Sequence, residues 1–117
     1  MMPRDLKAEF ERLLAREGGL YTFDEVMERV QSGKMQAFCE GDTLVITEIQ
    51  TYPRKKVLNV NYVVGRMEDL GAVIPKLVEF QEAVGAEFIG ATGRIGWVKK
   101  LKEFDNWKIR SINFMRV

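Results

Sequence analysis

The chain has 117 residues, of which 46% are hydrophobic, 30% charged and 10% aromatic. This length favours a single domain over 1–117, and the apolar fraction is too high for a disordered chain. The sequence has no histidine and one cysteine, which excludes imidazole-based triads, His-ligated zinc and internal disulfides. It has no run of 18 apolar residues and no apolar leader, so we expect neither a membrane span nor a secretory signal.

The charge is unevenly distributed along the chain. Residues 1–93 carry 11 Lys and Arg against 15 Asp and Glu, whereas residues 94–117 carry 7 against 2. A basic end suits an anionic partner such as phosphate or nucleic acid. A solvated helix face and a lysine-protected edge strand are the favoured interpretation, because the isoelectric point is near 7.8 and no platform of stacking aromatics is evident.

The first two predicted elements are helices. Over residues 4–16, apolar side chains recur at helical spacing and form one stripe, which Gly18 and Gly19 end. The second helix begins at Thr22, which with Glu25 has the spacing of a capping box. Both helices are interpreted as structural.

Three strands follow, over residues 35–40, 43–52 and 57–64. Gly41 and Asp42 provide a tight turn between the first two, and short links predict an antiparallel meander. The third strand is nearly all apolar, so we expect it to lie centrally with both faces covered.

The remaining chain alternates helix and strand. A helix is predicted over residues 68–84, with a kink or a delayed start because Pro75 lacks a backbone N–H. A strand at 87–91, a short helix at 97–104 and a strand at 107–117 complete the prediction.

Four short segments carry a family resemblance: Thr47-Glu48-Ile49, Tyr52-Pro53-Arg54-Lys55-Lys56-Val57-Leu58, Val64-Gly65, and Gly93-Arg94-Ile95-Gly96-Trp97 followed by Leu101. With the element order, they make residues 20–117 resemble the GNAT acyltransferases without their first strand. The chain resembles in particular small GNAT-like proteins of tailed bacteriophages. The resemblance implies an α+β domain with a mostly antiparallel sheet of about five strands, helices on both faces, and a parallel pair at 57–64 and 87–91.

In GNAT enzymes a glycine-rich loop at the start of the long helix holds the acyl-CoA pyrophosphate, favoured by the helix dipole. If this chain were active, the matching cofactor-binding residues would be Gly65, Arg66, Met67 and Asp69. The glycine spacing departs from the family pattern, and Glu68 and Asp69 fall in the first helical turn. Like unit charges at about 4 Å cost about 4 kcal/mol at an effective dielectric constant of about 20. We therefore expect these acids to cap the helix, and no acyl-CoA to bind.

The resemblance also implies a base and an acid, for which Glu48 and Tyr62 are the candidates if the chain is active. The short helix at 97–104 has no tyrosine to serve as the family's acid. The favoured interpretation makes Tyr62 a core residue with a wet hydroxyl, and Glu48 a residue of an open face that pairs with Arg54 or Lys56.

The loop before the last predicted helix is an anion-binding candidate through Gly93, Arg94, Gly96 and Lys99. The same residues also suit a tight structural turn, with Arg94 in an ion pair. Cys39 lacks a basic neighbour, so we expect a small core residue rather than a reactive thiol. No metal site is predicted.

Three functional hypotheses follow, in this order. The first is a non-catalytic GNAT-like accessory or virion component that works through a protein partner or self-association, in the host cytoplasm or the virion. The second is an acetyl-CoA-dependent N-acyltransferase with a non-standard loop. The third is a weak nucleic-acid-binding module that uses Arg94, Lys99, Lys100, Lys102 and Arg110.

Overall fold

A four-stranded mixed sheet forms the centre of the molecule, with strand order β1-β2-β3-β4. The computed structural model describes residues 5–91, 107–108 and 116. The strands are β1 (Gln36–Glu40), β2 (Thr43–Thr51), β3 (Lys56–Val64) and β4 (Phe88–Ala91). The first three pair antiparallel and β4 pairs parallel to β3, as the sequence predicted. The described residues form four strands rather than about five, and most of the expected strand 107–117 and all of the helix 97–104 lie outside them.

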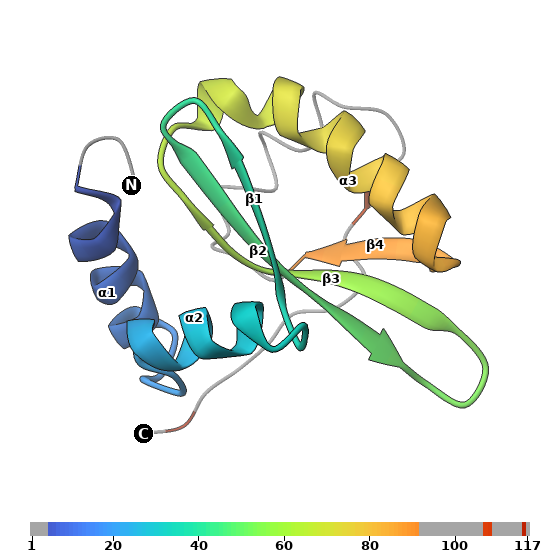
Figure 1. Cartoon of the computed structure of the whole chain (residues 1–117), viewed down its shortest axis with the longest axis horizontal. Coiled ribbons are helices and arrows are strands. Elements are labelled where there is room, and N and C mark those ends of the chain that lie inside the picture. Colours follow the sequence, from blue (N-terminus) through green and yellow to red (C-terminus); the bar gives the residue numbers. More distant parts are fainter. Residues whose placement is uncertain (1–4, 92–106, 109–115, 117) are drawn as a thin grey trace.

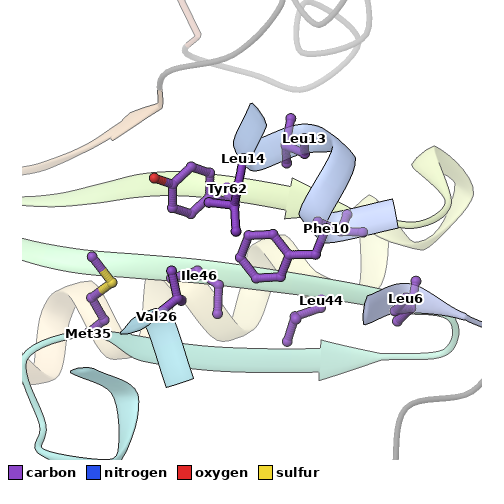
Figure 2. Packing of buried hydrophobic residues seen from close by; sticks show 10 residues of the cluster. Leu6, Phe10, Leu13, Leu14, Val26, Met35, Leu44, Ile46 and Tyr62 are labelled. Atoms are coloured by element: carbon purple, nitrogen blue, oxygen red, sulfur yellow. The ribbon is translucent and has the colours of Figure 1, made fainter. Parts of the chain in front are cut away.

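Helices cover both faces of this sheet (Figure 1). On one face, α1 (Leu6–Arg16) and α2 (Phe23–Gln31) enclose a core around Phe10, which is fully buried (Figure 2). On the other face, α3 (Leu70–Val84) packs Val73 and Leu77 against the sheet. The central strand β3 contributes buried side chains to both cores, which confirms its predicted position. None of the described helices is long and apolar enough to cross a bilayer.

Local sequence signals explain the helix boundaries. The Thr22 hydroxyl accepts the Glu25 N–H at 3.1 Å and the Glu25 carboxylate accepts the Thr22 N–H at 2.8 Å, so the capping box is confirmed. The helix α3 starts at Leu70, after a 3-10 turn η1 (Met67–Asp69). Pro75 lies inside α3, five residues after Leu70, so the missing N–H of this proline does not set the start of the helix.

One strand departs from regular pairing. Ile46 pairs with Tyr62 and Thr47 pairs with Val60, so Asn61 is an extra residue in β3, a β-bulge. Past Val60, β3 runs on to Val64 without a partner in β4, which pairs only as far as Ala91. The bulge re-aims the Asn61 side chain, which turns to the same face as Tyr62.

The position of Cys39 differs from the prediction. Its side chain is exposed, not in the core. Its neighbour Phe38 faces α3, where its ring lies 5.6 Å from that of Phe80. Because β1 is an edge strand, Cys39 points to the opposite face beyond the cover of the helices.

Candidate functional site

The loop from β3 to α3, where the resemblance places a pyrophosphate, is bonded to the turn between β1 and β2. The hydroxyl of Thr43, which is 1% exposed, accepts the Arg66 N–H at 2.9 Å. That hydroxyl also lies 2.9 Å from the Arg66 carbonyl and 2.9 Å from the Asp69 carboxylate, and donates to one of them at a time. The Asp69 carboxylate accepts the Asp42 N–H at 3.2 Å. We call Asp42, Thr43, Arg66 and Asp69 the turn lock.

Two glycines allow this close approach. Gly65 has a φ of +123°, and a Cβ there would lie 2.1 Å from the Asp42 carbonyl oxygen. Gly41 has a φ of +56°, and a Cβ there would lie 2.9 Å from an Asp69 carboxylate oxygen. A side chain at position 65 would force the turn and the loop apart, whereas one at position 41 would displace the Asp69 carboxylate and hold a strained φ.

Three backbone donors of the loop, the amides of Arg66, Glu68 and Asp69, are engaged within the chain itself. The Arg66 N–H bonds to Thr43, and the Asp69 N–H bonds to the Arg66 carbonyl at 3.2 Å. The pKa of the Glu68 carboxyl lies below its ordinary value, chiefly because the carboxylate accepts its own backbone N–H and then a bond from Arg66. The Glu68 carboxylate lies 3.3 Å from the Arg66 Nε, so a protein anion already occupies this arginine.

The predicted helix-capping role of the two acids is wrong. Glu68 and Asp69 belong to η1 and precede the α-helix instead of forming its first turn. Asp69 stands at the N-cap position without a capping side-chain bond, because its carboxylate is directed to Asp42 and Thr43. The turn lock therefore fixes the Asp69 carboxylate. The side chain of Met67 lies outside the described part of the structure.

A second polar cluster surrounds Glu48 on the sheet face that α1 and α2 cover. Its carboxylate lies 3.4 Å from the Arg29 Nη2 and accepts the Asn61 side-chain N–H at 3.0 Å. Asn59 donates in turn to Asn61. Glu48 therefore pairs with Arg29, not with Arg54 or Lys56 as expected, because alternation along β2 directs its side chain toward α2.

The Arg29 guanidinium joins this cluster to the surface. The Arg29 Cζ atom lies 5.5 Å from the centre of the Tyr21 ring, a cation–π distance. Its Nε is buried and has no acceptor among the described residues. It also lines a shallow depression of about 250 Å³, together with Tyr21, Glu25, Glu28, Ser32 and Lys34.

Tyr62 is a core residue, as the favoured interpretation expected. It is 8% exposed and its ring centre lies 5.4 Å from that of Phe10 (Figure 2). Burial raises the pKa of its hydroxyl, with smaller contributions from Tyr21, Glu17 and Glu48. Its hydroxyl bonds to no described residue. The structure thus brings Tyr62 and Glu48 to one sheet face, where the Glu48 carboxylate bonds to Arg29 and Asn61 and acts on Tyr62 only through its charge.

Sequence inspection missed three residues of these clusters: Arg29, Asn61 and Thr43. Two asparagines in the otherwise apolar strand at 57–64 were the available signal for Asn61, since an amide there needs a partner. The anion-binding candidates Gly93, Arg94, Gly96 and Lys99 lie outside the described residues. The same holds for the other predicted nucleic-acid contacts, Lys100, Lys102 and Arg110.

Comparison with known proteins shows the fold. No protein-family model and no curated protein matches the sequence. A tetramutant of the BH1408 protein from Bacillus halodurans matches with a TM-score of 0.66 at 10% identity, over 96% of this chain and 89% of that one. A Trypanosoma brucei acetyltransferase matches with a TM-score of 0.63 at 12% identity, over 99% and 96% of the two chains.

A ribosomal-protein-alanine N-acetyltransferase from Brucella melitensis matches with a TM-score of 0.59 at 18% identity, over the whole of this chain and 95% of that one. Sequence identities this low support a shared fold and nothing more. The described sheet, with β4 parallel to β3 and helices on both faces, is thus a GNAT-like α+β arrangement.

Proposed function

We propose that this protein is a GNAT-fold module that acts through protein contacts instead of acyl transfer. The observation that supports this most is the self-satisfied loop between β3 and α3. Its Arg66 and Asp69 amides bond to Thr43 and to the Arg66 carbonyl, and the Glu68 carboxylate holds its own amide and the Arg66 side chain. An acyl-CoA diphosphate needs those donors, so it does not fit these residues as they lie.

Electrostatics acts in the same direction. A diphosphate at this loop would meet the carboxylates of Glu68 and Asp69 and would have to displace Glu68 from Arg66. Like charges repel, so both carboxylates oppose the binding of a diphosphate and counteract the attraction that a helix N-terminus offers an anion.

The resemblance to GNAT-like proteins of tailed bacteriophages supports a more specific role. The segments that carry it include Thr47-Glu48-Ile49 on β2 and Val64-Gly65 at the end of β3. We place the protein among phage accessory or virion-associated components, with the host cytoplasm or the particle as its location. Nucleic acid is a weaker candidate partner, through the basic residues of 94–117.

One observation favours a second candidate function, acyl-CoA-dependent N-acyltransfer. The bulge at Asn61 directs a side-chain amide to Glu48, a residue type that can serve as a general base. Several proteins of similar structure are acetyltransferases by name. The loop donors remain the obstacle to this function.

Calorimetric titration with acetyl-CoA separates the two functions. The contact role predicts no saturable heat with a dissociation constant below about 1 mM, equivalent to about −4 kcal/mol. The matched variant Glu68→Gln removes the charge that holds the Glu68 amide and the Arg66 side chain, and it leaves the turn lock intact. Its titration shows whether these two donors, once released, bind acetyl-CoA weakly. A low-micromolar dissociation constant for the wild type, lost on Arg66→Glu, would establish the acyltransferase function instead.

A further inference from the structure

The turn between β2 and β3 is an exposed basic projection. Residues 51–55 are exposed without a break, and the turn extends beyond the helices (Figure 1). The Tyr52 N–H bonds to the Lys55 carbonyl at 2.9 Å and the Tyr52 hydroxyl donates to Gln50 at 2.9 Å, so the projection is preorganised. Arg54 and Lys55 make no ion pair with any described residue. We call 51–55 the basic finger.

The composition of the basic finger suits a protein contact. Tyrosine and arginine are enriched in the residues that dominate binding energy at interfaces. Tyr52 keeps 49% of its surface exposed, although its ring is held by Gln50. A rigid exposed ring beside two free cations loses little side-chain entropy on binding an anionic surface. Glu87, whose N–H bonds to the Lys56 carbonyl, lies behind the finger.

The opposite end of the same strands is acidic. The turn at Asp42 and the 3-10 turn with Glu68 and Asp69 lie together there, with Arg66 as a partial counterion. The Glu68 side chain is 71% exposed. The strand β2 connects the two ends with nine residues, or about 27 Å at about 3.4 Å per residue. This separation exceeds the screening length of about 10 Å at 0.1 M salt, so the ends cannot neutralise each other within one copy.

We propose that the basic finger of one copy docks on the acidic end of a second copy, around Asp42 and Glu68. This inference rests on the proposed contact role and names its partner. The contact joins two different surfaces, so it is heterologous and links copies head to tail into a ring or an open chain. Assembly therefore grows with protein concentration and weakens with salt.

Charge reversal of each surface tests the proposal by sedimentation velocity at low ionic strength. The finger variant is Arg54→Glu with Lys55→Glu, and the acidic-end variant is Asp42→Lys with Glu68→Lys. Each variant alone should associate about tenfold more weakly than the wild type, because its two docking surfaces then carry like charge. An equimolar mixture of the two should regain association, since both surfaces of one variant are then opposite in charge to both surfaces of the other.

A control variant carries the same change of net charge elsewhere: Arg12→Glu with Arg16→Glu, both exposed on α1, which lies on the other side of the molecule from the finger (Figure 1). It should associate as the wild type does. A wild type that stays monomeric at all concentrations overturns the proposal, as does a mixture that does not associate. A monomeric wild type that binds single-stranded oligonucleotide through Arg54 and Lys55 overturns it in favour of nucleic acid. Acetyl-CoA binding contradicts the proposed function and leaves this result unaffected.

Discussion

Replacement of Thr43 by valine removes the centre of the turn lock while the shape of the side chain is kept. In the native protein the hydroxyl accepts the Arg66 N–H and donates to the Asp69 carboxylate or the Arg66 carbonyl, all at 2.9 Å. The site is 1% exposed, so water does not replace these bonds. In Thr43→Val the Arg66 N–H loses its acceptor and Asp69 loses a charge-assisted donor.

The magnitude follows from these two losses. An unsatisfied buried donor costs about 1–3 kcal/mol, and a hydrogen bond to a charged group contributes about 1.5–3 kcal/mol. Because Asp69 keeps its bond to the Asp42 N–H, we expect a total of about 2–4 kcal/mol. For a domain of this size, that lowers the melting temperature by roughly 10 °C.

Urea unfolding followed by circular dichroism measures the effect as a lower midpoint with an unchanged slope. Thr47→Val is the matched control, because Thr47 is 0% exposed but its hydroxyl makes one neutral bond, to Gln36 at 2.9 Å. The control should lose about 1 kcal/mol. If Thr43→Val is no less stable than Thr47→Val, the bonds of the lock do not hold the loop, and the reasoning fails.

Three further predictions concern the glycine contact and the two shifted pKa values. Gly65→Ala should lower the free energy of unfolding by about 3 kcal/mol or more, because its Cβ would meet a carbonyl oxygen at 2.1 Å. Gly85→Ala also has a positive φ, +73°, but its Cβ would enter open space, so it should cost about 1 kcal/mol. Equal losses in urea unfolding would show that the contact at Gly65 is unimportant. The raised pKa of Tyr62 means that the unfolded state ionises first, near the ordinary tyrosine pKa of 10.0, so the stability of the wild type should fall as the pH rises above that value. The stability of Tyr62→Phe should fall less steeply, and parallel pH profiles would contradict this. The lowered pKa of Glu68 stabilises the fold above the ordinary glutamate pKa of 4.5 and ceases to do so as the pH falls. Glu68→Gln should therefore be less stable than the wild type at pH 7 and equal to it near pH 2, and a difference that persists in acid would refute the cause given.

Local signals in the sequence predicted most of the described fold. The capping box at Thr22 and Glu25 and the turn at Gly41 involve residues only a few positions apart, so each can be recognised without tertiary information. The nearly all-apolar sequence of β3 also placed that strand at the centre, since both of its faces need cover.

The candidate site was harder to predict from the sequence, because its contacts join residues far apart in the chain. Asp69 bonds to a turn 27 positions earlier, and Arg29 meets Glu48 across 19 positions. An acid near a helix start predicts a cap when only local structure is considered, and only the packing of the β1–β2 turn redirects Asp69. Likewise, the exposure of Cys39 could be predicted only with knowledge of which strand forms the edge of the sheet.

The state of the β3–α3 loop is best tested by amide NMR spectra recorded during titration with acetyl-CoA up to about 1 mM. The amides of Arg66, Glu68 and Asp69 are held by acceptors of the chain itself, so their resonances should stay in place. Saturable shifts confined to residues 65–70 would contradict this, because they would mean that the cofactor displaces the Glu68 carboxylate and takes its donors.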